Sequence, residues 1–504
     1  MKKVFCLFMA VVFAVMFAQC AKSDKASAGE PEIVADGGAA AVIENGVLSV
    51  TYPDDSYISD ITIDGNRVWL TDDTYCIGDT SSISEINVDA EKCPEYAENN
   101  EMSSVLLSIY DSKTNSYSVT WHTDSISHST VMLGWDGNSQ QKIITAYSDE
   151  GNGDYVNRAV FYNLEYNTDY SYTIYDSFGN ECYSSSFSTG EENPQEITFM
   201  HVSDTQDETY NGTVWNQLMT DAYSHTENLD FIIHTGDMVQ YGGNEDLWSM
   251  MLGNVSDYVS SVPTMLTSGN HSYWSDYTDG ASEIEYNHTT VNLPEQDCEN
   301  GIYYSFDYGD IHFTVLSSGD SERTGVGSKQ REWLENDLKS TDKKWKIVAI
   351  HNPLYSPGKY GSSRDRNKIA RSQQKKLGKI FNEYSVDLVL EGHDHAFAVT
   401  KPMDENRNPV GCETETQQFG DSQAIYLQKP AAPVYLMSAA GGSQNRKVVD
   451  TYEPSWFLKA QSIPDNTAGY SIITVSENTL TSTFYEYNYA DDAVTSTYSW
   501  GIVK

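Results

Sequence analysis

The chain has 504 residues, which is long enough for two or three domains with cores of their own. Its 73 acidic and 31 basic residues give a formal net charge of −42. So acidic a surface disfavours nucleic acid and anionic membranes as stable partners, and it will not attract an anionic substrate from a distance.

Residues 1–20 have the features of a signal peptide. Lysines precede an apolar stretch, Val4–Ala18, that is too short to cross a bilayer comfortably. Cys20 follows Phe-Ala-Gln, which is similar to a bacterial lipoprotein processing site. We therefore expect an exported protein, either lipid-anchored at Cys20 in the bacterial cell envelope or, as the alternative, secreted or periplasmic. A membrane would be a partner only through that anchor.

Export would place the mature chain where disulfides persist. Cys76 and Cys93 are the expected pair, because a bond between them closes a short loop. No cysteine shows a metal-binding spacing such as C-x-x-C, and an odd number in the mature chain leaves at least one unpaired. The others in the mature chain are Cys182, Cys298 and Cys412.

Three segments of different character follow the signal peptide. Residues 21–41 are small, polar and rich in glycine, so we expect a flexible tether. Residues 42–101 alternate short apolar segments with Asp, Gly and Asn turns, which predicts a small β-rich segment of unknown role. Residues 102–191 contain strands and turns at the spacing of a β-sandwich, with Trp121 in its core. Residues 190–195, GEENPQ, are the expected linker.

From residue 195 to 504, apolar strand segments alternate with amphipathic helical segments, which predicts an α/β domain. The strand-like segments near the C-terminus predict a β-hairpin with its turn at Ser-Glu-Asn-Thr, 476–479. The predicted helices are 212–226, 244–261, 329–341 and 371–384.

Polar side chains follow five apolar runs in this part of the chain. Ligands of open sheets gather at the carboxyl ends of strands, where these side chains would lie. One such residue alone is usually turn or capping chemistry, but five blocks in one order are not explained that way. Carboxylate, amide and imidazole groups are donors for transition metals. The runs are 197–206, 229–242, 263–272, 345–355 and 386–397, and the donors are Asp204, Asp237, Asn270, His351, His393 and His395.

This order of blocks resembles the calcineurin-like metallophosphoesterases, whose pattern is an Asp block, Gly-Asp, Gly-Asn-His, a single His after a strand, and Gly-His-x-His. Segments 302–318, 351–358 and 392–403 are similar to the purple acid phosphatase branch. The resemblance covers roughly residues 103–440. It implies an α/β catalytic domain, a four-layer αββα sandwich, after an all-β, Ig-like or fibronectin type III-like β-sandwich at 102–191.

The resemblance also implies two divalent or trivalent metal ions, which could be iron, zinc or manganese. Asp237 would bridge them, and a hydroxide held between them would attack a phosphate ester in line. His271 is not expected to be a ligand; it would steady developing charge or protonate the leaving oxygen. The implied ligands are Asp204 and His395 for the first metal, and Asn270, His351 and His393 for the second.

The chain departs from the family pattern at the metal site. Gln206 stands where many members have a metal-binding His, so it is either a weak amide ligand or lies just behind the ligands. Gln240 stands where purple acid phosphatases have an iron(III)-binding Tyr, and Tyr241 is one residue further along. We therefore expect neither an iron(III) site nor a purple colour.

The loop after His351 lacks the histidines of plant-type members. Lys359, Arg364 or Arg366 would meet a phosphate there or, as the alternative, form a solvated basic loop. The remaining histidines carry no expected function: His201, His234 and His312 lie in apolar runs and are expected in the core, and His122, His128, His225 and His288 have no local metal pattern.

Three functions stay open at this point. The first is hydrolysis of a small phosphate monoester, in the manner of an acid phosphatase. The second is a phosphodiesterase or nucleotide pyrophosphatase with the same metals. The third is a surface binding protein whose phosphoesterase domain is inert. The intact set of donors argues against the third.

Overall fold

The structure, a computed structural model, describes residues 31–53, 56–78, 80–92, 101–126, 129–137, 139–150, 154–226, 228–273, 288–293, 302–318, 325–359, 366–420, 422–450 and 452–504. The expected signal peptide with Cys20, residues 21–30 of the expected tether, Cys93, His128, Cys298, Arg364 and the side chain of Arg366 lie outside this part. No helix within it is long and apolar enough to span a membrane.

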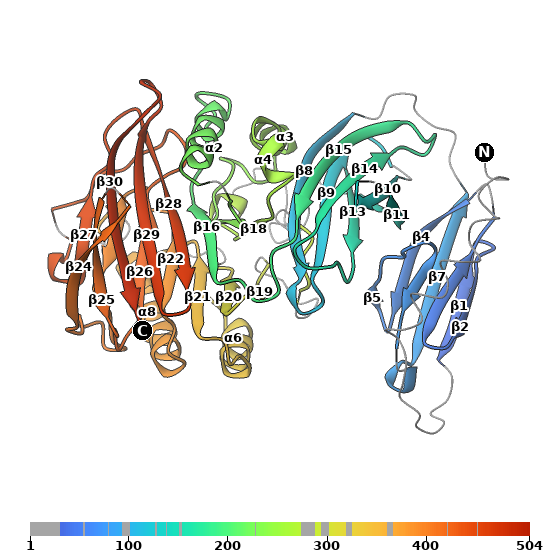
Figure 1. The fold of residues 1–504 in the computed structure, drawn as a ribbon, viewed down its shortest axis with the longest axis horizontal. Helices are drawn as coiled ribbons and strands as arrows, with labels where there is room; N and C mark the ends of the chain where they lie inside the picture. Colours follow the sequence, from blue (N-terminus) through green and yellow to red (C-terminus); the bar gives the residue numbers. More distant parts are fainter. Residues whose placement is uncertain are drawn as a thin grey trace.

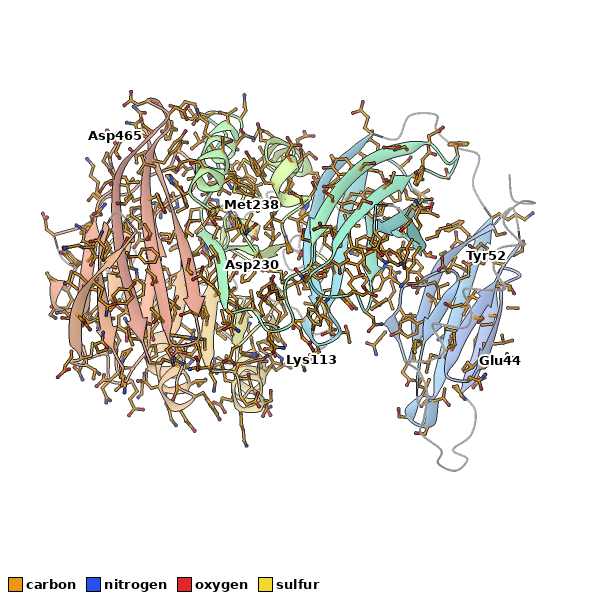
Figure 2. All side chains as sticks on the ribbon, viewed as in Figure 1. Glu44, Tyr52, Lys113, Asp230, Met238 and Asp465 are labelled. Atoms are coloured by element: carbon orange, nitrogen blue, oxygen red, sulfur yellow. The ribbon has the colours of Figure 1, made fainter. Side chains whose placement is uncertain are left out.

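Three parts lie side by side along the molecule: an N-terminal β unit (residues 32–92), a β-sandwich (102–188) and an α/β part (196–503) (Figure 1). Figure 2 shows Glu44 and Tyr52 of the N-terminal β unit far from Asp465 at the other end. The part of the chain before residue 190 that the structure describes is thus all β, apart from short 3-10 turns.

The N-terminal β unit has two small sheets around a core that includes Leu48, Ile61 and Val88, all fully buried. One sheet has the order β1-β7-β4-β5 and the other β2-β3-β6. The strands are β1 (Glu32–Asp36), β2 (Ala40–Glu44), β3 (Val47–Thr51), β4 (Ser56–Ile63), β5 (Asn66–Arg67), β6 (Thr74–Cys76) and β7 (Glu85–Lys92).

The prediction of a flexible tether at 21–41 is wrong for its second half, which contains a strand. Residues 32–36 form β1, which pairs in parallel with β7 from Glu32 opposite Glu85 to Asp36 opposite Asp89. All five side chains of β1 are exposed. Backbone hydrogen bonds therefore hold this edge strand, and its side-chain composition does not reveal it.

The β-sandwich packs a sheet of order β12-β13-β9-β8 on one of order β11-β10-β14-β15. Trp121 is fully buried in the core between them, as expected from the sequence, beside Tyr172 and Phe187. The strands are β8 (Met102–Asp111), β9 (Ser116–Thr123), β10 (Thr130–Trp135), β11 (Gln140–Thr145), β12 (Tyr147–Glu150), β13 (Tyr155–Phe161), β14 (Asp169–Tyr175) and β15 (Glu181–Ser188).

The α/β part contains two large sheets whose facing sides share one core. The eight-stranded sheet runs β18 (Thr264–Leu266), β17 (Phe231–His234), β16 (Glu196–Val202), β28 (Thr467–Ser476), β29 (Thr479–Asn488), β30 (Ala493–Val503), β25 (Ser422–Gln428), β24 (Glu413–Phe419). The seven-stranded sheet runs β19 (Tyr304–Tyr308), β20 (Ile311–Leu316), β21 (Trp345–Ile350), β22 (Leu388–Glu391), β26 (Val434–Ser438), β23 (Phe397–Thr400), β27 (Phe457–Gln461). The expected C-terminal hairpin is confirmed as β28 and β29.

Helices cover the outer faces of both sheets. Apolar residues of α2 and α3, such as Trp215 and Trp248, pack with Met200 of β16. Those of α6 and α8, such as Leu334 and Phe381, pack on the seven-stranded sheet. The predicted helices are confirmed in place, as α2 (Thr213–His225), α3 (Glu245–Asn254) with α4 (Ser256–Val259), α6 (Ser328–Ser340) and α8 (Arg366–Glu383).

The helix predicted at 244–261 is interrupted at Val255. That residue has φ −119° and ψ 17°, which ends α3 and starts α4. Gly253 and Asn254 immediately before it have low helix propensity, which favours an interruption at this point. Both short helices pack against β8 of the β-sandwich (Figure 1).

Parallel pairing determines where the polar blocks meet. Strands β16, β17 and β18 are parallel neighbours in one sheet, and β21 and β22 are parallel neighbours in the other. The carboxyl ends of parallel strands lie at one edge, so the residues after them share that edge.

Candidate metal centre

Four of the candidate ligands hold the chain in an uncommon backbone conformation. Asp204 after β16 has φ 53°, Asp237 after β17 has φ 54°, and His393 and His395 after β22 have φ 73° and 50°. This left-handed region is unfavourable for residues with a Cβ and is concentrated at sites where the surrounding structure enforces it. The turns therefore direct these side chains inward, and the rest of the fold stabilises the unfavourable backbone conformation.

Glycines next to these residues leave no room for a side chain. A Cβ on Gly269 would lie 2.1 Å from Oδ1 of Asp237. A Cβ on Gly392 would lie 2.0 Å from Oγ of Ser203 and 3.0 Å from Oδ2 of Asp204. The glycines of Gly-Asn-His and Gly-His-Asp-His thus allow the backbone to approach both carboxylates closely.

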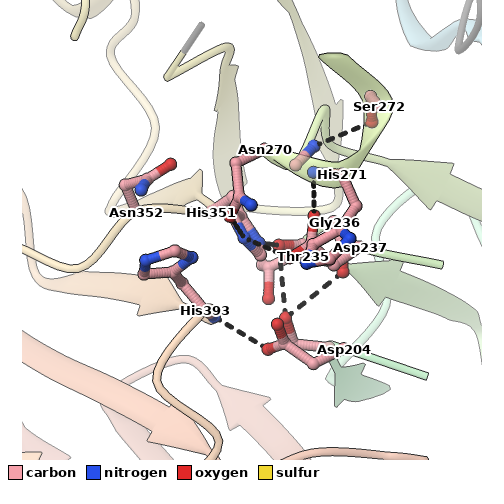
Figure 3. A network of polar contacts seen from close by, with 12 residues as sticks. Asp204, Thr235, Gly236, Asp237, Asn270, His271, Ser272, His351, Asn352 and His393 are labelled. Atoms are coloured by element: carbon pink, nitrogen blue, oxygen red, sulfur yellow. Dashed lines mark hydrogen bonds and ion pairs between the residues drawn. The ribbon is translucent and has the colours of Figure 1, made fainter. Parts of the chain in front are cut away.

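One group of donors gathers around Asp237. Nε2 of His351 lies 3.0 Å from Oδ2 of Asp237 and 3.2 Å from Oδ1 of Asn270. Donor atoms of Asp237, His351 and His393 all lie within 4.8 Å of one another. Figure 3 shows these side chains around one space, each from a different strand end. Such spacing matches neighbouring ligands of one metal ion, whose bonds are about 2.0–2.2 Å.

A second group gathers around Asp204. Oδ1 of Asp204 lies 3.2 Å from Nε2 of His395. These two atoms, and both polar side-chain atoms of Gln206, are buried and have no hydrogen-bond partner in the described part of the chain. Buried polar groups are nearly always satisfied, so the adjacent carboxylate and imidazole, left open, fit a cation site. The open amide of Gln206, two residues after Asp204, is a further candidate donor.

Hydrogen bonds place the histidines in the tautomer that a metal requires. Nδ1 of His351 donates to the carbonyl of Thr235 over 2.7 Å, and Nδ1 of His395 donates to the carbonyl of Gln444. A carbonyl can only accept, so Nδ1 carries the hydrogen and Nε2 is left for a ligand. The backbone N–H of His393 donates to Oδ2 of Asp204 over 2.8 Å.

The site is arranged to keep its carboxylates charged. Burial opposes ionisation of Asp237, but the adjacent His351 charge and hydrogen bond outweigh it and lower the pKa of Asp237 to about 2. Burial likewise opposes ionisation of Asp204, and His395 lowers its pKa to about 2. The pKa of His351 is raised to about 9, because the attraction of Asp237 outweighs its burial, so a cation that binds Nε2 displaces a proton from it. Both carboxylates are therefore charged and ready to bind a cation.

His271 lies beside the centre without joining it. Its backbone N–H donates to Oδ1 of Asp237 over 2.8 Å, and its Nδ1 donates to the carbonyl of Gln240 over 2.7 Å. Nε2 of its ring lies 3.9 Å from Oδ2 of Asp237. The ring thus directs one nitrogen toward the same space as the donors, which suits a proton-transfer group.

The departures from the family pattern have clear positions. The side chain of Gln240 accepts a hydrogen bond from Gln444 over 2.9 Å, and Tyr241 is 45% exposed. Tyr241 therefore does not compensate for the tyrosine that the sequence lacks. Lys359 is exposed, and residues 360–365 after it lie outside the described part.

The sequence interpretation missed Arg446. Its guanidinium donates to the carbonyl of His393 over 2.8 Å, so a cation stands beside the donors. Its segment follows AAGG, 439–442, where the N–H groups of Gly441 and Gly442 donate to the carbonyls of Ser203 and Asp204. No local motif marks Arg446, because this contact joins residues far apart in the chain.

The histidines expected in the core are confirmed there. His201 contacts the hydroxyls of Ser438 and Thr235, and His234 contacts that of Thr205. His312 lies between two carboxylates. Among the remaining histidines, which have no local metal pattern in the sequence, His122 and His288 lie together with Glu245 in a further group of possible metal donors. They are distant in sequence, so no spacing rule could have revealed them.

Comparison with known proteins gives, for part of the chain, the same family that the sequence motifs resemble. Residues 197–397 match the family model described as calcineurin-like phosphoesterase. Purple acid phosphatase 21 of Arabidopsis thaliana is 25% identical over 45% of this chain and 53% of its own length. A nucleotide pyrophosphatase/phosphodiesterase of Hordeum vulgare is 24% identical over 53% of this chain and 70% of its own length.

The fold has a counterpart among solved structures. Purple acid phosphatase PPD1 from yellow lupin (Lupinus luteus) seeds superposes with a TM-score of 0.63 and 17% identity, covering 91% of this chain and 79% of that chain. The chain spans about half the length of the first curated relative that it matches. The likeness therefore covers the fold, while the residues around Asp237 carry the argument about chemistry.

Proposed function

Because residues 197–397 form a calcineurin-like phosphoesterase domain similar to that of purple acid phosphatases, we propose that this protein is a metal-dependent phosphoesterase that hydrolyses phosphate monoesters. The proposal includes the four-layer αββα arrangement for the two sheets and their outer helices. Its strongest support is the convergence of Asp237, His351 and His393 donors within 4.8 Å.

The chain offers ligands for two metal ions, of iron, zinc or manganese. Bound there, two ions supply a water of lowered pKa as the nucleophile and positive charge for the phosphoryl group. Asp237 would be the ligand that the two ions share. The open amide of Gln206 is the additional donor near Asp204. The remaining ligands would be His395 with Asp204 in one group, and Asn270, His351 and His393 in the other.

The residues around the donors would bind the substrate and move its proton. His271, fixed through Nδ1 by the carbonyl of Gln240, presents Nε2 to the departing oxygen and protonates it. Arg446 adds positive charge next to His393 and would hold a phosphoryl oxygen. The net charge of −42 argues against a polyanionic substrate.

Parallel assays of the purified full chain on p-nitrophenyl phosphate and bis-(p-nitrophenyl) phosphate, with metal content measured, test the proposal. Hydrolysis of the monoester by metal-loaded protein, and little of the diester, is the expected result. A metal-loaded protein that hydrolyses neither ester would contradict the proposal and favour a binding protein with an inert domain.

A second candidate is a phosphodiesterase or nucleotide pyrophosphatase with the same donors. The Hordeum vulgare relative of that name favours it. The same pair of assays separates the two, because preference for the diester would transfer the assignment to this second activity.

We also propose that the protein is exported. Cys76 is disulfide-bonded, while Cys182 and Cys412 are free. A disulfide in a bacterial-type envelope protein agrees with an oxidising compartment. The pairing of Cys76 with Cys93 stays a prediction. Labelling with a palmitate analogue tests the anchor: wild-type protein should be labelled and Cys20→Ser should not, whereas equal labelling of both would exclude Cys20 as the anchor.

A further inference from the structure

A second cluster of titratable side chains lies away from the strand ends, where the β-sandwich meets the α/β part. His122 belongs to β9 and Asp154 directly precedes β13, both in the β-sandwich. Glu245 is the first residue of α3, and His288 lies further along the chain, also in the α/β part. We name these four residues the interface cluster. None of them has a role in the proposed reaction.

The interface cluster has the dimensions of a metal site. Oε2 of Glu245 lies 3.3 Å from Nε2 of His288 and 3.6 Å from Nδ1 of His122. Oδ2 of Asp154 lies 2.5 Å from Nδ1 of His122. Tetrahedral ligands with bonds of about 2.0–2.2 Å stand roughly 3.3–3.6 Å apart, so the two contacts of Glu245 match the edges of such a site. The shorter contact between Asp154 and His122 is a hydrogen bond that orients the ring.

Several atoms of the interface cluster lack partners. Both ring nitrogens of His288 and both carboxylate oxygens of Glu245 are buried, and the described residues offer them no hydrogen bond. The same holds for Oδ1 of Asp154. His288 is fully buried, so water does not reach it. Buried polar atoms left open in such numbers indicate a ligand that satisfies them together.

The local environment holds the ring of His288 in place and neutral. The ring of His288 stacks on Trp248 at 3.9 Å and on His122 at 4.5 Å. Burial lowers the pKa of His288 well below its usual value, which keeps the metal-binding neutral form. Burial also raises the pKa of Glu245 to about 7, as expected for a carboxylate whose charge has no adequate partner.

The neighbouring backbone is anchored firmly enough to present these side chains. Thr289 and Thr290, next to His288, meet the β-sandwich through side-chain hydrogen bonds with Ser108 over 3.0 Å and Thr120 over 2.8 Å. The interface cluster is therefore part of a built contact between the two parts of the molecule, not a chance meeting of exposed groups.

We propose that His122, Glu245 and His288 bind one divalent transition-metal ion that joins the β-sandwich to the α/β part, with Asp154 holding the ring of His122 by a hydrogen bond. Two imidazoles and a carboxylate suit Zn²⁺, Fe²⁺ or Mn²⁺. The ion would balance the two buried carboxylates, and by binding only the folded chain it would stabilise the fold.

The bound ion would also steady the loop around Gly242. This loop reaches the strand-end centre, as we name the donors Asp204, Asp237, Asn270, His351, His393 and His395. Nε1 of Trp248 donates to the carbonyl of Gly242 over 2.8 Å, and the N–H of Gly242 donates to the carbonyl of His271 over 3.1 Å. Glu245 begins the helix that follows this loop. An ion on Glu245 therefore acts on His271 only through the backbone, as a positioning device.

Metal content of the full chain tests the proposal. Glu245→Gln keeps the shape of the side chain but removes its charge, and His288→Gln removes an imidazole. Each variant should hold one metal ion per chain fewer than the wild type, and its affinity for added Zn²⁺ at that site should fall at least about tenfold. His225→Ala is the matched control, because His225 lies 3.4 Å from Asp221 but outside any donor group, and should keep the full content.

Crystals of the wild-type protein soaked in ZnCl₂ give an independent test that does not depend on a variant that folds. Anomalous scattering at the zinc edge should show a peak between Nε2 of His288 and Oε2 of Glu245. No peak there, or variants with the wild-type metal content, would overturn the proposal. Activity on phosphate esters plays no part in either outcome, so failure here is distinct from failure of the proposed function.

Discussion

The strand-end centre and the interface cluster use the same side chains in different ways. At the strand ends, each donor stands in a short block after an apolar run, glycines precede Asp237, Asn270 and His393, and four donors adopt positive φ. In the interface cluster, His122, Asp154, Glu245 and His288 come from separate elements with no such motif around them. The first arrangement is suited to chemistry at an open edge, and the second to holding two parts of a molecule together. The comparison teaches that motif spacing detects the first kind of site and not the second.

Asp237→Asn should break the strand-end centre and leave the interface cluster intact. The amide cannot bridge two cations as a carboxylate does, so we expect hydrolysis to fall by at least about 1,000-fold, with loss of metal at the strand ends. Asp230→Asn is the control, since Asp230 is a half-buried carboxylate of the same part that accepts hydrogen bonds from Thr198 and Tyr308, away from the donors. Loss of every metal ion from Asp237→Asn would show that the two sites are not independent.

Gly269→Ala tests whether the glycine motifs create the difference. Its methyl group would lie 2.1 Å from Oδ1 of Asp237, so the carboxylate must move, and we expect about a 100-fold loss of kcat/KM. Gly253→Ala in α3 meets nothing within 4 Å and should keep full activity. Steady-state kinetics on p-nitrophenyl phosphate measure both. Equal activities would mean that the close approach of Gly269 has no role.

The same contrast explains how much the sequence predicts. The buried strands before Asp237 and His351 and the amphipathic helix predicted at 212–226 have clear apolar patterns in the local sequence. The structure has these elements where they are expected. The edge strand β1 was missed because backbone pairing with β7 forms it while its side chains are exposed. Arg446 was missed because only the tertiary fold brings it to His393.

Gln206 offers a graded test of the strand-end centre. Its amide is buried and open, so Gln206→Ala should lower the affinity for one metal ion about 10–100-fold, whereas Gln206→His should restore it or raise it. Metal titration followed by calorimetry measures the change. Unchanged affinity in Gln206→Ala would place Gln206 beside the ligands instead of among them.

His312 is a contrast to the histidines of both donor groups, because both of its nitrogens are already paired with carboxylates. Nδ1 lies 2.7 Å from Asp307 and Nε2 lies 3.0 Å from Asp337. Although burial opposes the charged form, these carboxylates raise the pKa of His312 to about 9. This group should be an ion pair and should bind no metal.

A raised pKa in the folded state stabilises the fold below the unfolded pKa of about 6.5, and this contribution is lost as pH rises through about 9. We expect the free energy of unfolding of the wild type to fall by about 3 kcal/mol across that window on account of His312. In His312→Gln this fall should be absent. Urea unfolding at both ends of the window measures it, and identical pH profiles would remove His312 from the account.

The most direct measurement compares hydrolysis of p-nitrophenyl phosphate by the wild-type protein before chelation, after its metal has been removed and measured, and after metal is returned. The donors around Asp237 and Asp204 require that activity disappear with the metal and come back with it, and that Asp237→Asn never recover. Undiminished hydrolysis by protein shown to be free of metal would contradict the account.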